Sequence, residues 1–202
     1  MKNKIYKEEI RNAINATLNE NCLVPEEAEL LGKYNPYRSN NTYEALYSLF
    51  IKHFAEADET IDLSKVRGQC LNYHTQILDM MKKEFNVNAV LTIGYVNFYE
   101  EDFWKFEKIS PSLVRTLPNG KDRVIDIHVW LTLPSLEIID LTFLAHIAYI
   151  TSQPEKQLRL RKATDFPYCF GTAEFLFNEE KIIYHPKYIG TDILLKNGFA
   201  RS

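Results

Sequence analysis

The chain has 202 residues, a formal net charge of −3 and 25% charged side chains. This length suits a single domain, spanning 1–202, with a sizeable core. The slight negative charge offers no basic face of the kind that binds nucleic acid nonspecifically, so we expect no nucleic-acid partner. No window approaches eighteen apolar residues, and we therefore expect no membrane span.

The three cysteines are Cys22, Cys70 and Cys169. Their odd number and the lack of a CxxC spacing argue against a disulfide framework and against a zinc ribbon. The N-terminus is charged and leads into an amphipathic pattern with no apolar leader. These features predict a cytoplasmic protein, and we expect neither a cofactor nor a metal.

The N-terminal part, 1–60, is predicted to be helical. Apolar residues at helical spacing indicate a first helix over 3–20. Pro25 and Gly32 bound a short second helix, and a loop over 33–41 precedes a third helix that Thr42 caps and that continues to Phe54. We expect these helices to cover the core.

The next helix is predicted from Cys70 to Phe85. Its apolar stripe, at steps of three and four, is Cys70, His74, Ile77, Leu78, Met81 and Phe85. This face should point inward, so Cys70 should face the body of the protein. Lys82 and Lys83 lie in the last turn, where they complement the helix dipole.

After this helix the apolar period changes to two, which predicts strands over 87–96, 113–117, 124–133 and 136–143. The acidic and aromatic segment 98–111 is predicted to hold a short helix, and 118–121 to form a turn. In the run 124–133, odd-numbered residues form the core side and even-numbered residues, including His128 and Trp130, the other face. Together, 61–145 should form the core of the domain.

The segment 146–202 is predicted to be a C-terminal extension of the same domain. Residues 153–161 are polar and basic and indicate a helix. Residues 181–185 indicate a strand, and the remainder is mixed.

Three residues suggest nucleophilic chemistry: Cys70 at a helix start, His128 on one strand and Asp140 on the next. The free N–H groups of a first helical turn favour a thiolate. An imidazole within hydrogen-bond reach can take the thiol proton and later protonate the leaving group, and a carboxylate on the far nitrogen fixes the tautomer. The hypothesis is a Cys70-His128-Asp140 triad.

Strand alternation sets a condition for this triad. If Pro134-Ser135 were a two-residue loop, Asp140 would lie opposite Val129, on the wrong face. A three-residue loop places Trp130 opposite Asp140, and a five-residue loop places His128 opposite it. The triad therefore requires a loop of odd length or a bulge.

The order of these motifs resembles the core of the transglutaminase-like superfamily over residues 66–143. The motifs are Gly68-Gln69-Cys70 at a helix start, a strand ending in Gly94-Tyr95, His128-Val129-Trp130 on one strand and Asp140-Leu141-Thr142 on the next. The resemblance implies an α+β, papain-like fold with a catalytic helix packed on an antiparallel sheet. It also implies that Cys70 is the nucleophile, His128 the base and Asp140 its partner.

Arg67-Gly68-Gln69-Cys70 is also similar to the active-site stretch of arylamine N-acetyltransferases, without the second glycine of their Arg-Gly-Gly run. The chain departs from the superfamily pattern at Leu71, where an aromatic residue is common. The long stretch between Tyr95 and His128 predicts an insertion or a lid.

The oxyanion donors are expected to include the N–H group of Cys70, with the side chain of Gln69 as a candidate second donor. Trp130 is a candidate wall of the site. His74, four residues after Cys70, is interpreted as a packed or hydrogen-bonded neighbour; a metal held by Cys70, His74 and His128 is the alternative.

We therefore expect a cysteine-dependent hydrolase or acyltransferase that acts on amide bonds, with peptidase activity favoured and a peptide or protein as substrate. Two alternatives remain. One is a non-catalytic protein-binding module that keeps the fold, and the other is an acetyltransferase, although no phosphate-binding loop marks a coenzyme A site.

Overall fold

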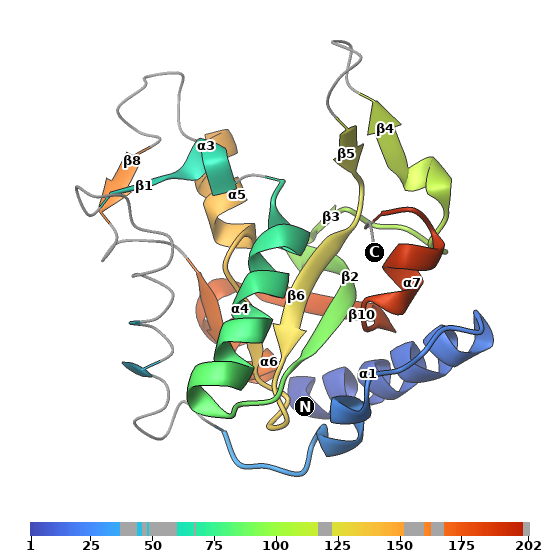
Figure 1. The fold of residues 1–202 in the computed structure, drawn as a ribbon. Coiled ribbons are helices and arrows are strands. Elements are labelled where there is room, and N and C mark those ends of the chain that lie inside the picture. Colours follow the sequence, from blue (N-terminus) through green and yellow to red (C-terminus); the bar gives the residue numbers. More distant parts are fainter. Residues whose placement is uncertain are drawn as a thin grey trace.

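The central feature of the computed structural model is an antiparallel sheet (Figure 1). Its strand order is β10 (Ile182–Ile189), β2 (Val90–Phe98), β6 (His128–Thr132), β7 (Ile138–Asp140) and β9 (Cys169–Gly171). The structure describes residues 1–36, 44–45, 48, 60–66, 68–116, 123–151, 160–162 and 168–199. Helices and antiparallel strands mix along the chain, which confirms the α+β class.

Strand β2 pairs with two different strands along one edge. Its first part, from Val90 to Gly94, pairs with β6. Its last part, from Val96 to Phe98, pairs with β3 (Glu101–Phe103). Strands β3 and β6 therefore follow one another along the same side of β2, and the end of β3 comes next to the start of β6.

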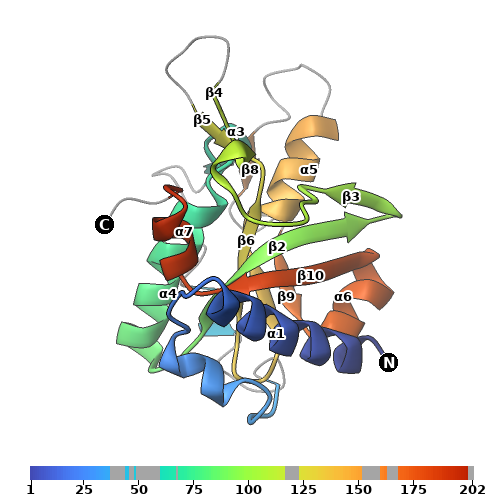
Figure 2. The ribbon, with the colours of Figure 1, turned by 90° about the vertical axis from the view of Figure 1, so that its right-hand side faces the viewer.

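Helices cover both faces of this sheet (Figure 2). Helix α4 (Cys70–Phe85) packs on β6 and β2 from one side, and its buried residues His74, Ile77 and Met81 confirm the inward stripe. Helix α1 (Lys2–Asn19) packs along β10 on the opposite side, together with α6 (Ala173–Glu180). Each face thus has its own apolar cluster.

Smaller elements surround this centre. Two-stranded ladders join β1 (Thr60–Asp62) to β8 (Leu160–Lys162) and β4 (Val114–Thr116) to β5 (Arg123–Ile125). The remaining helices are α3 (Leu63–Val66), α5 (Phe143–Thr151) and α7 (Asp192–Lys196), with 3-10 turns η1 (Glu26–Leu30) and η3 (Pro111–Leu113). No helix among the described residues is long and apolar enough to cross a membrane.

Several predicted elements are confirmed and others are wrong. Helix α1 confirms the predicted helix over 3–20. The run 124–133 is interrupted between β5 and β6, and 98–111 contains the strand β3 rather than a helix. The strand predicted over 136–143 ends at Asp140 because α5 begins at Phe143. Helices α5, α6 and α7 and strand β9 were not anticipated.

Some predictions fall on residues that the structure does not describe. They are most of the helix capped by Thr42, the turn over 118–121, and residues 153–159 of the helix predicted over 153–161. The last two residues of that helix, Leu160 and Arg161, belong instead to strand β8.

The connection between β6 and β7 has odd length. Leu131 pairs with Ile139, and the N–H group of Leu133 bonds to the carbonyl of Glu137 at 2.9 Å. The loop is therefore the three residues 134–136, and Leu136 takes the left-handed conformation (φ 66°) that such loops use. This parity places Asp140 on the same face of the sheet as His128, which meets the condition for the triad.

Candidate active site

Cys70 is the first residue of α4 and is partly buried. Gly68, two residues earlier, has a φ of 72°, in the left-handed region that glycine adopts without strain. Tyr73 donates the first helical hydrogen bond, to the carbonyl of Gln69 at 2.9 Å. The N–H groups before Tyr73 precede this ladder, so the thiol lies at a turn whose free donors favour negative charge.

His128 begins β6 and bonds to Asp140 at the end of β7, with 2.6 Å between Nε2 and Oδ2. Both side chains are almost wholly buried. Burial by itself lowers the pKa of His128, but the charge and hydrogen bond of Asp140, together with Cys70, raise that pKa to about 10. Burial likewise opposes ionisation of Asp140, yet His128 and His74 hold the pKa of this carboxyl below its usual range. The pair is an imidazolium and a carboxylate.

Four further donors hold Asp140 in place. Oδ1 accepts from the N–H groups of Thr142 (2.9 Å) and Phe143 (3.0 Å) and from the Thr142 hydroxyl (3.2 Å). Oδ2 accepts from the Tyr184 hydroxyl at 2.9 Å as well as from His128. Asp140 therefore also caps the start of α5, which explains why the strand stops there.

The three predicted catalytic residues come together at one end of the sheet. The side chain of Cys70 lies near His128 and contributes to the raised pKa of that imidazole. Because Nε2 of His128 is engaged by Asp140, Nδ1 is the nitrogen that remains for the thiol. This order of groups can take a proton from a thiol and return it to a leaving group.

Trp104, which follows β3, lies flat on the His128 ring. The ring centroids are 4.6 Å apart and the planes differ by 12°, and His146 contacts the same indole at 4.9 Å. Trp104 has a φ of 57°, so the backbone turns sharply as β3 ends. The insertion predicted between Tyr95 and His128 thus supplies the ring that covers the histidine.

Trp130 is packed in the core, whereas Gln69 is exposed. Trp130 is fully buried between the sheet and α1, where its Nε1 donates to the Tyr6 hydroxyl at 3.0 Å. Its ring centroid is 6.0 Å from that of His128. Gln69 is exposed, and its Oε1 accepts a 3.5 Å bond from Asn72. The face of 124–133 predicted to lie opposite the core side is packed as well, because α1 covers it.

Two residues of the site were missed in the sequence. Tyr184 alternates inward along β10, but no local pattern ties it to Asp140. Trp104 stands in an acidic, aromatic segment, and only the pairing of β3 with β2 brings it to His128. For the cap at Asp140, a signal was available: Asp140 and Thr142 precede an apolar helical run beginning at Phe143.

Among the described residues, no group of three or more His, Cys, Asp or Glu side chains is arranged to hold a metal. In particular, both ring nitrogens of His74 are engaged by backbone groups. The metal alternative therefore has no support from the geometry of His74.

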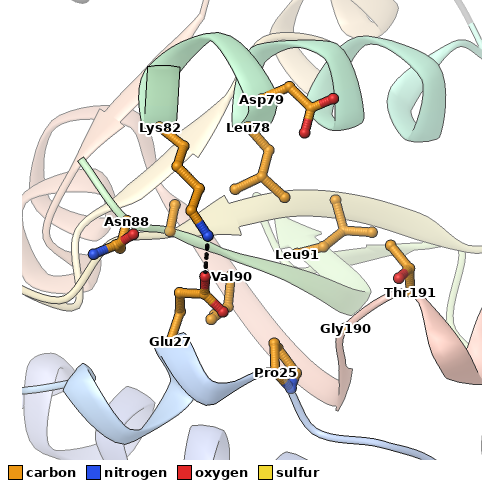
Figure 3. A pocket seen from close by; sticks show the side chains of 11 residues that line it. Pro25, Glu27, Leu78, Asp79, Lys82, Asn88, Val90, Leu91, Gly190 and Thr191 are labelled. Carbon is orange, nitrogen blue, oxygen red and sulfur yellow. Dashed lines mark hydrogen bonds and ion pairs between the residues drawn. The ribbon is translucent and has the colours of Figure 1, made fainter. Parts of the chain in front are cut away.

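A pocket lies elsewhere, between η1, the second half of α4 and the start of β2 (Figure 3). Leu78 and Leu91 lie along it, and a 2.7 Å ion pair joins Lys82 to Glu27 beside it. The nearest of its lining residues along α4, Leu78, comes eight residues after Cys70. None of the three catalytic candidates lines this pocket.

Comparisons of the chain with models of protein families, with curated proteins and with solved structures found no match.

Proposed function

We propose that the protein is a cysteine-dependent hydrolase or acyltransferase that acts on amide bonds of a peptide or protein, with hydrolysis favoured. Its core would then be of the transglutaminase-like, papain-like kind. The observation that carries the proposal is the buried 2.6 Å bond between His128 and Asp140, with Cys70 near enough to the same imidazole to raise its pKa. The free thiols are consistent with a reducing compartment such as the cytoplasm.

The proposed reaction has two steps. The thiolate of Cys70 attacks the amide carbonyl carbon, and the C=O π electrons move to the oxygen. When the adduct collapses, the C–N bond breaks and the His128 imidazolium gives its proton to the departing amine. Water or an amine then attacks the thioester, His128 accepts its proton, and Cys70 leaves as a thiolate.

The residues around the His128–Asp140 pair support these steps. The Asp140 carboxylate stabilises the imidazolium before the first proton transfer and again after the second, because it is buried and held by several donors. Trp104 keeps water off one face of the ring. The N–H group of Cys70, at the helix start, is the proposed first oxyanion donor.

Alkylation by iodoacetamide tests the nucleophile. Cys70 should react near neutral pH much faster than Cys22 and Cys169, which are 4% and 1% exposed and serve as internal controls. His128→Gln should slow Cys70, because a carboxamide can still donate to Asp140 but cannot act as a base. Equal, slow labelling of all three cysteines would refute the proposed enzymatic activity.

Intact mass after incubation with acyl donors tests the substrate class. Peptidyl esters should leave a peptidyl group on Cys70, and Cys70→Ala should abolish the adduct. An adduct formed only from acetyl-coenzyme A would identify an acetyltransferase instead. A reactive Cys70 that accepts no acyl group would contradict acyl transfer and favour the binding module.

A further inference from the structure

His74 lies one helical turn after Cys70 and is wholly buried. Its Nδ1 is 2.6 Å from the carbonyl oxygen of Cys70, and its Nε2 is 3.0 Å from the N–H group of Leu141. A carbonyl only accepts and an N–H group only donates, so the proton must be on Nδ1 and Nε2 must be free to accept. Both partners therefore require the same neutral tautomer.

These two hydrogen bonds join the helix that carries Cys70 to the strand that carries Asp140. One ends on the backbone of Cys70 in α4, and the other on Leu141, the residue that directly follows β7. Strand β7 pairs with β6 through Ile138 and Ile139, whereas Asp140 pairs with Cys169 of β9. Within the described part of the chain, the imidazole of His74 is thus a direct bridge between the helix start and the end of β7.

The charges around His74 favour the neutral ring. Burial lowers the pKa of His74 to about 4; the nearby His128 acts in the same direction, and Asp140, 3.6 Å away, opposes it. A proton on Nε2 would face the N–H group of Leu141 and would compete with His128 for Asp140. Two histidines therefore flank one carboxylate, and only His128 carries a proton on both nitrogens.

We propose that His74 is a positioning residue that sets Cys70 at the correct distance from the His128–Asp140 pair through its hydrogen bond to Leu141. The inference rests on the proposed function, because it concerns the reactivity of the same thiol. His74 itself does not touch the reacting atoms.

A pair of amide variants separates the two hydrogen bonds. In His74→Gln, the carboxamide reaches about as far as Nε2 and can still accept from Leu141. In His74→Asn, it reaches about as far as Nδ1 and can bond only to Cys70. The measurement is the rate of Cys70 alkylation by iodoacetamide from pH 5 to pH 9, with thermal unfolding followed on the same samples.

Met81→Ala provides the matched control. Met81 is also wholly buried on the inner face of α4, but lies about two turns beyond His74 along the helix. The Met81→Ala variant should lower the stability of the fold, because a buried side chain is truncated. It should not change the pH profile of Cys70 alkylation. It therefore shows what destabilisation alone does to the alkylation rate.

We expect His74→Asn to slow alkylation at pH 7 by roughly 10- to 100-fold and to displace the pH profile, since misplacement of about 1 Å costs up to about 100-fold. His74→Gln should stay within about threefold of the wild type and keep its profile, because it keeps the bridge. Equal rates in both variants, or a loss no larger than in Met81→Ala, would overturn the inference. Slow alkylation of Cys70 in the wild-type protein would refute the proposed function itself.

Discussion

The hydroxyl group of Tyr184 and the imidazole of His128 bond to the same oxygen of Asp140, at 2.9 and 2.6 Å. Tyr184 lies on β10 and Asp140 on β7, and β2 and β6 stand between these strands in the order of the sheet, so this hydrogen bond joins two strands that are not neighbours. Burial and the Asp140 charge hold the pKa of Tyr184 well above its usual value. The hydroxyl group therefore stays protonated at neutral pH and remains a hydrogen-bond donor to Asp140.

Tyr184→Phe should weaken this support. A hydrogen bond to a charged acceptor contributes about 1.5–3 kcal/mol, so we expect a loss of stability of that order. Cys70 should also alkylate more slowly, because His128 loses a fixed partner. Denaturant unfolding and the alkylation rate give the two readouts.

Tyr188→Phe, on the same strand, is the control. Tyr188 belongs to the apolar cluster on the α4 side, and its hydroxyl accepts a long 3.5 Å bond from the N–H group of Ile109. It should alter neither the alkylation rate nor its pH dependence. A Tyr184 variant that behaves like the Tyr188 variant would show that Asp140 needs no second side-chain donor.

Replacing Trp104 by alanine should change the titration of His128. The stacked indole keeps water from the imidazole and from its bond to Asp140. Without it, solvent would screen the charge pair, and the pKa of His128 should fall from about 10 toward its ordinary value of about 6.5. The ring-proton shift of His128 in NMR spectra, followed against pH, measures this change.

Trp104→Phe should preserve most of the effect, because it keeps an aromatic ring at the position. If Trp104→Ala left the His128 titration unchanged, the ring would be no more than a surface contact.

The stability of the fold should pass through a maximum near pH 6.5. The pKa of His128 is raised to about 10, so its contribution to the free energy of unfolding is complete below about pH 6.5. This contribution is lost as the pH rises from about 6.5 to about 10. The pKa of His74 is lowered to about 4, so its contribution is complete above about 6.5 and is lost as the pH falls. Asp140, with a lowered pKa, adds to the loss at acid pH.

Each group contributes a slope of at most about 1.4 kcal/mol per pH unit. Urea unfolding at half-unit steps from pH 4.5 to 9.5 would trace the curve. Two variants identify its limbs: His74→Gln should flatten the acid side and His128→Gln the alkaline side. A curve that rises steadily to pH 9 would contradict the charge assignment of the dyad.

The parts of the site that could be predicted depend on short-range periodicity. A step of three or four residues places Cys70 at the start of an amphipathic helix with His74 on its inner face. Alternation along two strands relates His128 to Asp140 once the loop parity is known. Each of these inferences needs only neighbours that lie within a few residues along the chain.

The parts that could not be predicted depend on partners far apart in sequence. Whether Trp130 faces a cavity or the core depends on α1, whose Tyr6 bonds to it from 124 residues away. The position of Trp104 depends on β3, which pairs with the last part of β2 along the edge whose first part pairs with β6. Alternation specifies two faces of a strand but does not say what covers each of them.

Gly94 and Gly68 offer a final contrast, between steric clash and backbone strain. A Cβ atom on Gly94 would lie 2.1 Å from the carbonyl oxygen of His185 and 2.7 Å from Cη2 of Trp130. Gly94→Ala should therefore cost about 3 kcal/mol, because a backbone oxygen within the sheet cannot move aside. Gly68 has open space around it but a φ of 72°, so Gly68→Ala should cost about 1–2 kcal/mol, from strain alone.

Thermal and urea unfolding of the two alanine variants should give this order. The variants should also differ in how they affect the thiol. Gly68 stands two residues before Cys70, so its strain falls on the turn that presents the Cys70 thiol, and Cys70 alkylation should slow even where the fold remains intact. Gly94→Ala should lower stability first and slow Cys70 only as the sheet under Trp130 is displaced. The reverse order of stabilities would mean that β2 and β10 are not packed as closely as this arrangement requires.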